Sequence, residues 1–340
     1  MNFSAILDKN YIPRLNTLLF SLRTYCSDFT FYVVALDDET YCYFNQQSNC
    51  ISISIAEIQA FYPILSQLKQ ERDPISYIFT LSPFYPSYIL EKFQEIDHIC
   101  SLDSDQFFFS SPQPVFDLLH DYSVLITPHR FSKKLEELDY SRFGKYNVSF
   151  QVFKRDEVGL TCLSLWRDQC TAWCFDREEN GLYADQKYLD VWEEILGDKV
   201  HVIQDKGLGL APWNIEDAQL QRRQGKLFID ENELIVYHYQ GLKLLQDGYV
   251  YTFLDHYTCP ETNDIHVYIY KPLVRKLLEF TSTIDSFNRN NRTFDYDFMV
   301  EKADFVFKKK FVFLVEFRQY LKLQNWVYGL RNRFTNIFRR

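Results

Sequence analysis

Two aspartates separated by one serine, Asp103 and Asp105, are the side chains of this sequence best suited to bind a metal ion. A short, largely apolar run precedes them and three phenylalanines follow, which predicts a buried strand that ends at the acidic pair. Because side chains alternate along an extended chain, both carboxylates face the same way. Like charges side by side repel unless a cation lies between them, and Mg²⁺ and Mn²⁺ prefer such oxygen ligands. The pair is therefore a candidate binding site for a metal ion that holds a diphosphate. The alternative is that both are solvated aspartates in a turn.

The segments around the acidic pair alternate between strands and helices. Strands are predicted at 2–7 and 29–36, with a helix over 13–25 between them. This order predicts a βαβ unit, and hence an α/β fold whose parallel sheet has a cleft at the carboxyl ends of its strands. No Gly-x-Gly-x-x-Gly follows the first strand, which argues against a dinucleotide-binding fingerprint.

The alternation continues to about residue 245. Further strands are predicted at 51–55, 123–127, 146–153, 201–204 and 234–239, the last of them in the same sheet. Further helices are predicted at 56–72, at 75–93 with a break near its prolines, at 112–120, at 156–175 and at 273–280.

The charge of the chain is unevenly distributed. The net charge is −9, yet residues 271–340 carry 15 Lys and Arg against 7 Asp and Glu. Such a basic, aromatic tail is typical of segments that meet a membrane surface, and docking of the tail on the body is the alternative. The acidic body argues against binding of nucleic acid. We predict one domain over 1–254 and a C-terminal helical extension over 255–340.

Nothing in the sequence indicates export or membrane insertion. No run of about eighteen apolar residues is present, and the first residues lack a basic flank and an apolar core. We therefore expect a cytoplasmic protein, either free or peripheral at a membrane. The eight cysteines form no paired Cys-x-x-Cys motifs, so we expect reduced, mostly buried thiols and no zinc site.

The acidic segment, Ser-Leu-Asp-Ser-Asp at 101–105, resembles the Asp-x-Asp motif of glycosyltransferases with the GT-A fold. It is most similar to the family 8 group, in which Tyr-Leu-Asp-x-Asp is common. Four more short segments between residues 2 and 245 resemble motifs of that family and occur in the same order. The resemblance implies a GT-A-type mixed, mainly parallel sheet flanked by helices, and a nucleotide-sugar donor.

The first of these segments, Leu-Asp-Lys-Asn-Tyr at 7–11, resembles the family's first nucleotide-contacting motif. By resemblance, Asp8 binds the base, and Asn10 or Tyr11 approaches the base and the ribose. Capping of the helix that follows is the alternative role for Asp8.

Two further segments are expected to bind the donor sugar. Asn147 begins a predicted strand and resembles the family's Asn-x-Gly motif, although Ser149 replaces the glycine; a turn residue is the alternative. Asp185 and Gln186 lie at a predicted helix start, where such side chains offer acceptors and donors to sugar hydroxyls. The resemblance implies that these two contact the sugar near its anomeric carbon, and an ordinary helix cap is the alternative.

The last segment runs from His238 to Lys243. Its His-x-x-Gly pattern fits the family, but Lys243 lies one place early and the family's Pro-Trp is missing. A neutral imidazole can complete a metal site with aspartates, and Gly241 lets the backbone approach a phosphate. The resemblance implies that His238 is the third metal ligand and that Gly241 and Lys243 meet the diphosphate. A packed core histidine is the alternative.

Two other positions bear on this interpretation. The family usually has an arginine in the helix near Phe79, and none is present there. Trp213 lies in a loop with glycines and a proline, which favours a rigid loop with an exposed ring that stacks on an acceptor sugar. A core tryptophan is the alternative.

Together the ordered segments predict a metal-dependent glycosyltransferase of the hexosyltransferase class. The resemblance implies that Asp103, Asp105 and His238 bind Mn²⁺ or Mg²⁺, that a UDP-sugar is the donor, and that a glycan or glycolipid accepts the sugar with retention. One alternative is a degenerate carbohydrate-binding or scaffold protein of the same fold. Another is a haloacid-dehalogenase-type phosphatase, which usually has Thr or Val where this chain has Phe107.

Overall fold

The computed structural model describes residues 1–244 and 250–287. The chain forms two compact units. The first comprises Met1–Gln240 and Tyr257–Cys259, and the second comprises Gly241–His256 together with the residues from Pro260 onward. All the predicted metal ligands belong to the first unit.

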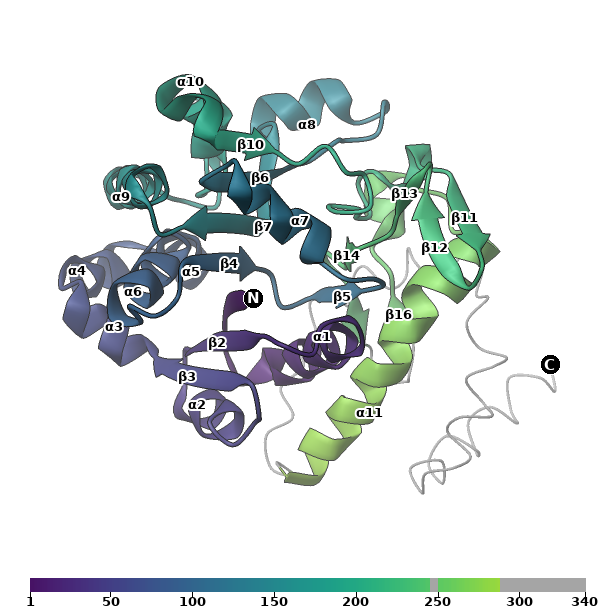
Figure 1. Ribbon diagram of the computed structural model, residues 1–340, viewed down its shortest axis with the longest axis horizontal. Helices are drawn as coiled ribbons and strands as arrows, with labels where there is room; N and C mark the ends of the chain where they lie inside the picture. Colours follow the sequence, from purple (N-terminus) through teal and green to yellow (C-terminus); the bar gives the residue numbers. More distant parts are fainter. Residues whose placement is uncertain (245–249, 288–340) are drawn as a thin grey trace. The chain divides into compact units, whose positions relative to one another are not determined.

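A seven-stranded sheet organises the first unit, and its strand order is β10-β6-β7-β4-β1-β2-β3 (Figure 1). β7 runs antiparallel to both of its neighbours, whereas the other neighbouring pairs are parallel. The predicted α/β class with a mixed, mainly parallel sheet is therefore confirmed. The strands are β1 (Asn2–Leu7), β2 (Thr30–Ala35), β3 (Cys50–Ser54), β4 (His98–Leu102), β6 (Val124–Pro128), β7 (Tyr146–Lys154) and β10 (Val200–Val202).

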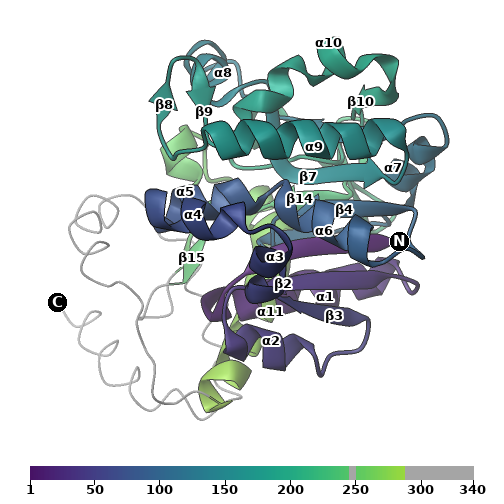
Figure 2. The same cartoon turned by 90° about the vertical axis from the view of Figure 1, so that its left-hand side faces the viewer.

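Helices connect these strands and cover the sheet, and Figure 2 shows α6 and α9 lying side by side over it. The longer ones are α1 (Ile12–Tyr25), α2 (Asp38–Phe44), α3 (Ile55–Phe61), α4 (Ile64–Glu71), α5 (Pro74–Leu81), α6 (Phe84–Lys92), α8 (Glu136–Phe143) and α9 (Glu157–Ala172). Shorter helical pieces are η1 (Lys9–Tyr11), α7 (Gln113–Asp117), η2 (Leu118–His120), η3 (Lys187–Val191), α10 (Trp192–Leu196), η4 (Gly197–Lys199) and η5 (Ile215–Asp217).

Prolines divide two of the predicted helices. The single helix predicted over 56–72 is wrong, because Pro63 separates α3 from α4. Proline lacks an N–H and clashes with the preceding turn, so a helix cannot run through it undisturbed. The break predicted near Pro83 is confirmed between α5 and α6. The break predicted near Pro86 is wrong, because Pro86 falls in the first turn of α6, where its missing N–H has no helical partner to lose.

A large aromatic core lies between the sheet and the helices on this face. Trp166 of α9 and Trp192 of α10 are fully buried, and their rings meet edge to face at 5.3 Å. Phe153 of β7 contacts both rings. Burial of aromatic rings of this size supplies a large share of the hydrophobic stabilisation of a domain.

A separate two-stranded ladder lies outside the main sheet. β5 (Gln106–Phe108) pairs antiparallel with β14 (Val236–His238), so the prediction that 234–239 is a strand of the main sheet is wrong. The chain leaves the main sheet at the acidic pair, and β14 pairs with the segment that follows the pair. Smaller antiparallel pieces are β8 (Glu178–Glu179) with β9 (Leu182–Tyr183), and β11 (Leu220–Arg223) with β12 (Lys226–Ile229) and β13 (Asn232–Glu233).

The second unit contains β15 (Lys243–Leu244), β16 (Val250–Tyr251), a π-helical turn (Ile265–Tyr270) and α11 (Lys271–Phe287). The helix predicted at 273–280 lies within α11. The basic and aromatic segment from 308 onward lies outside the described residues, so its contact with a membrane surface stays a prediction. Within the described part of the chain, no helix has the length and apolar character needed to cross a membrane.

We expect Gly159→Ala to destabilise the protein. Gly159 lies in the first turn of α9, where a Cβ atom would be 2.1 Å from the backbone oxygen of Lys154. Relief of this overlap would push α9 away from the sheet, at a cost of about 1–3 kcal/mol in the free energy of unfolding. Urea unfolding measures the difference. The matched control, Thr161→Ala at an exposed position of the same helix, should change it by less than about 0.5 kcal/mol; equal effects of the two substitutions would contradict the packing argument.

Candidate metal centre

The strand directions place several polar and ionisable side chains at one edge of the sheet. β1 and β4 are parallel neighbours, and they end immediately before Asp8 and Asp103. β7 runs the opposite way, so its beginning, with Asn147, lies at the same edge. β6 ends there too, immediately before His129. The topology therefore gathers residues that are far apart in the sequence.

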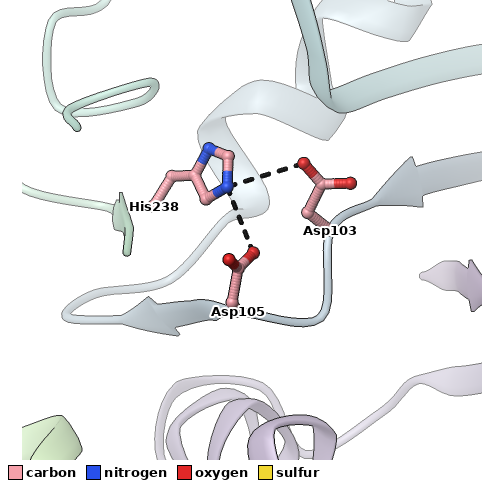
Figure 3. A group of neighbouring side chains, drawn as sticks. All are labelled: Asp103, Asp105 and His238. Carbon is pink, nitrogen blue, oxygen red and sulfur yellow. Dashed lines mark ion pairs between the residues drawn. The ribbon is translucent and has the colours of Figure 1, made fainter. Parts of the chain in front are cut away.

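Asp103, Asp105 and His238 converge at this edge (Figure 3). Nε2 of His238 lies 3.5 Å from Oδ2 of Asp103 and 3.1 Å from Oδ1 of Asp105. One ligand atom from each residue lies within 4.8 Å of the others, which suits a single metal ion. His238 is buried, whereas the Asp103 side chain is 45% exposed and leaves the site open to a ligand. The structure thus brings together the three residues from which the sequence predicted a metal site.

The ladder between β5 and β14 places His238 beside the acidic pair. In its register, His238 lies opposite Gln106, the residue after Asp105. The backbone N–H of Tyr239 donates to the carbonyl of Asp105 at 2.9 Å, and the N–H of His238 donates to the carbonyl of Leu210 at 2.9 Å. A slip of one residue would turn the imidazole to the opposite face of the ladder. Backbone pairing therefore fixes the position of the third ligand.

The electrostatics of the cluster favour a bound cation. Burial opposes the charged form of His238, but Asp105 and Asp103 outweigh it and raise the pKa of the imidazole. Desolvation by the surrounding protein raises the pKa of Asp103 although part of its side chain is exposed; the charge of Asp105 adds to this rise, and His238 opposes it. Although Nε2 is close to both carboxylates, neither ring nitrogen of His238 has a hydrogen-bond partner in the described part of the chain. Two carboxylates and an imidazole nitrogen that faces them suit a divalent ion such as Mn²⁺ or Mg²⁺.

The carboxylate of Asp8 accepts hydrogen bonds from a neighbouring residue. It caps η1, accepting from the backbone N–H of Asn10 at 2.9 Å and from its Nδ2 at 3.2 Å. Capping therefore describes the observed role of Asp8, although the turn it caps is the short η1 and not α1. The ring of Tyr11 is exposed beside it. Binding of the base and ribose by Asp8, Asn10 and Tyr11 stays a prediction.

Arg14, in the first turn of α1, is a candidate that the sequence motifs missed. Its guanidinium lies over the Tyr11 ring, 4.6 Å from the centroid. The pKa of Asp105 is lowered despite its burial, because His238 and the charge of Arg14 outweigh that burial. A cation at a helix N-terminus opposes the helix dipole. That unfavourable placement is the signal by which the sequence could have indicated a functional arginine.

Asp185 is buried next to the cluster. Its backbone carbonyl accepts from Nε1 of Trp166 at 2.8 Å, whereas its Oδ2 atom has no hydrogen-bond partner among the described residues. Burial raises the pKa of Asp185 to about 7, and Asp103 adds to the shift, although a hydrogen bond from Ser82 opposes it. This carboxyl group is therefore available both to hydrogen-bond a ligand and to exchange a proton near neutral pH.

Gln186 lies beside Asp185 but does not cap the short helix η3, so the helix-cap alternative is wrong for its side chain. Its Nε2 donates to the carbonyl of Phe143 at 2.8 Å, which turns the carboxamide toward α8. Contact of Asp185 and Gln186 with a donor sugar stays a prediction.

Asn147 is buried and its carboxamide oxygen is occupied. Oδ1 accepts from the backbone N–H of Ser149 at 3.0 Å and from its hydroxyl, and Nδ2 donates to the carbonyl of Pro128 at 3.4 Å. The serine that replaces the family's glycine thus supplies a hydroxyl to Asn147. Contact of Asn147 with a donor sugar stays a prediction.

Gly241 and Lys243 belong to the second unit. Gly241 has a φ of +75°, and a Cβ atom there would lie 2.3 Å from the ring of Phe253, so only glycine fits. Lys243 begins β15. Their predicted contact with a diphosphate stays a prediction.

Trp213 does not have the exposed ring that the loop composition predicted. It is 5% exposed, and its Nε1 donates to the carbonyl of His129 at 2.9 Å. The core alternative is therefore correct.

Thr80, which with Phe79 marks the place of the missing family arginine, is buried and bonds to Arg72 and to the carbonyl of Ser76.

Two curated bacterial proteins are similar in sequence to this chain. No family model matches the chain. Among curated proteins, YfnD of Bacillus subtilis is 28% identical over 291 residues, which cover 84% of this chain and 91% of the relative. YfnF of the same organism is 26% identical over 253 residues, which cover 72% of this chain and 82% of the relative. Both relatives are named as uncharacterized proteins.

The solved structures to which the chain is similar include glycosyltransferases. One is the galactosyltransferase LgtC in complex with donor and acceptor sugar analogues, with 15% identity, a TM-score of 0.48 and coverage of 83% of this chain and 96% of that one. Another is mouse xyloside xylosyltransferase 1, with 13% identity, a TM-score of 0.43 and coverage of 71% and 98%. GlyE of Streptococcus pneumoniae has 15% identity, a TM-score of 0.43 and coverage of 83% and 63%.

We expect Mn²⁺ binding to weaken as the pH falls from 7.5 to 5.5. A metal ligand must lose its proton, and the pKa values of His238 and Asp103 are both raised, so protons compete at a higher pH than at ordinary side chains. The apparent affinity should fall about tenfold or more over this range. Titration of the full chain with Mn²⁺, followed by electron paramagnetic resonance, measures it. The exposed-site control Asp168→Asn should follow the same profile, and an affinity constant with pH would contradict the assignment.

Asp185→Asn should stabilise the protein at high pH. The pKa of Asp185 is raised by burial to about 7, so between about pH 4 and 7 the folded state keeps a proton that the unfolded state has released. The free energy of unfolding therefore falls as the pH rises through this window. Each unit of pKa shift contributes about 1.36 kcal/mol, so the total loss is a few kcal/mol. The asparagine variant lacks this loss. Urea unfolding should show that the wild type and the variant are equally stable near pH 4 and that the variant is more stable at pH 8. A variant less stable than the wild type at pH 8 would contradict the raised pKa of Asp185.

Proposed function

We propose that this chain is a metal-dependent glycosyltransferase that moves a hexose from a UDP-sugar to a glycan or glycolipid, with retention at the anomeric carbon. The observation that carries the proposal is the convergence of Asp103, Asp105 and His238, with one ligand atom of each within 4.8 Å of the others. These residues come from segments that resemble glycosyltransferase motifs, in the order of that family. The imidazole is buried and comes from a segment far from the acidic pair in the sequence.

The residues present fit a hard divalent cation. Two carboxylates and one imidazole leave further coordination positions for phosphate oxygens and water, which is the arrangement that Mg²⁺ and Mn²⁺ adopt with nucleotides. The bound ion would neutralise the negative charge that develops on the leaving diphosphate. The exposure of the Asp103 side chain supports access for a donor of this size.

Arg14 would supply a second positive charge to the donor. It lies close enough to Asp105 to lower the pKa of that carboxyl, and its guanidinium rests on Tyr11, the residue expected near the ribose. Guanidinium groups bind phosphate through paired hydrogen bonds. In this proposal Arg14 takes over the role of the arginine that the family has near Phe79.

Asp185, Gln186 and Asn147 would orient the sugar. The unpaired Oδ2 of Asp185 can accept from a sugar hydroxyl, and its carboxyl group carries a charge for part of the time near pH 7. Gln186 retains its carboxamide oxygen as an acceptor, because only its Nε2 atom bonds to Phe143. These contacts would hold the anomeric carbon in place during transfer.

Thermal unfolding with a panel of nucleotide sugars, with and without Mn²⁺, tests the proposal. A UDP-sugar should raise the unfolding temperature only when Mn²⁺ is present, and release of UDP with an added glycan acceptor should follow. Metal-dependent binding without turnover would favour the degenerate carbohydrate-binding alternative. No shift with any nucleotide sugar would overturn the proposal.

Asp105→Asn should abolish metal-dependent turnover. The amide keeps the shape of the side chain but removes a negative ligand, so kcat should fall at least about a hundredfold. The matched control is Asp168→Asn, an exposed aspartate on α9 that should leave kcat unchanged. Full activity of the Asp105 variant at saturating Mn²⁺ would remove the site assignment.

A further inference from the structure

The imidazole of His238 is not fixed in the usual way for a metal ligand. Metal-binding histidines almost always donate their second N–H to a carboxylate or a carbonyl, which sets the orientation of the ring. Here Nε2 faces the two aspartates, while Nδ1 points away from them and is buried without a hydrogen-bond partner in the described residues (Figure 3). Another contact must therefore hold the ring.

The indole ring of Trp213 contacts the imidazole of His238. It lies 5.4 Å from the imidazole, centroid to centroid, and the two planes are nearly perpendicular, at 86°. A perpendicular arrangement brings the edge of one ring to the electron-rich face of the other, and an N–H group can donate weakly to such a face. We propose that Trp213 is the positioning residue of the metal centre: its indole receives the Nδ1 edge of His238 and so keeps Nε2 directed at the metal. This inference rests on the proposed metal site.

Trp213 is itself held firmly, as a positioning residue must be. Its Nε1 and the Nδ2 of Asn214 both donate to the carbonyl of His129, at 2.9 and 2.8 Å. The His129 ring stacks on Phe131 with centroids 4.5 Å apart, and its Nδ1 lies 2.9 Å from the carbonyl of Gly144. These contacts lock the indole in one orientation.

The His129 ring, whose backbone carbonyl accepts from the indole N–H, is uncharged. Burial lowers the pKa of His129 to about 3, so its imidazole carries no charge at neutral pH. No positive charge from this ring therefore lies behind the indole to oppose a cation at His238. A rigid, uncharged indole can orient a metal ligand without adding a competing proton acceptor.

Mn²⁺ binding to the full chain without nucleotide, measured at pH 7.5 by electron paramagnetic resonance, tests the proposal. Trp213→Leu removes the aromatic face and should weaken binding by roughly 10- to 100-fold. Trp213→Phe keeps a ring but loses the Nε1 hydrogen bond, and it should have a smaller effect. Trp173→Phe, a substitution in a tryptophan at the end of α9, should bind Mn²⁺ like the wild type.

A second measurement separates positioning from general loss of structure. In protein labelled with ¹⁵N-histidine, the Nδ1 proton of His238 should resonate upfield in the wild type, because of the indole ring current, and should move downfield in Trp213→Phe and Trp213→Leu. Folded Trp213→Leu protein that binds Mn²⁺ with wild-type affinity, while His238→Asn does not bind it, would overturn the positioning role and leave the metal site standing. Wild-type protein without Mn²⁺ binding would overturn both.

Discussion

The candidate site depends on holding two carboxylates and an imidazole closer together than they would remain in water. Asp103 and Asp105 repel each other, and the burial of His238 removes solvation that a charged ring would need. The backbone holds these groups in place: Asp103 directly follows β4, Asp105 directly precedes β5, and His238 ends β14, which pairs with β5. The buried Trp213 contacts the imidazole. Without that support, the three groups would separate into solvent.

Much of the fold was predictable because its signals are local. The apolar runs of β1 and β2 and the proline at the start of α1 show these elements and nearly their ends. The position of Asp103 after β4 followed from the same logic. The prediction of one helix over 56–72 was wrong at Pro63. Apolar residues recur at helical spacing on both sides of this proline, and the prediction gave that spacing more weight than the proline.

The rest depended on tertiary pairing. β14 has only three residues, and nothing in its own sequence distinguishes the main sheet from a separate ladder with β5. The burial of Trp213 follows from an acceptor at His129, which lies far away in the sequence. Arg14 has no motif of its own, since its importance depends on the proximity of Asp105. The convergence of Asp103, Asp105 and His238 was expected only from the resemblance, because spacing in the chain carries no information on it.

The ladder between β5 and β14 also bears on the assembly of the protein. It joins segments roughly 130 residues apart, and contacts of such long range carry a large loop-closure entropy and form slowly. The parallel neighbours β1 and β2 are much closer in the chain and can pair without it. A nascent or partly folded chain can thus possess a well-formed sheet and both aspartates while its third ligand is still absent. The metal site is therefore incomplete until β14 has paired with β5.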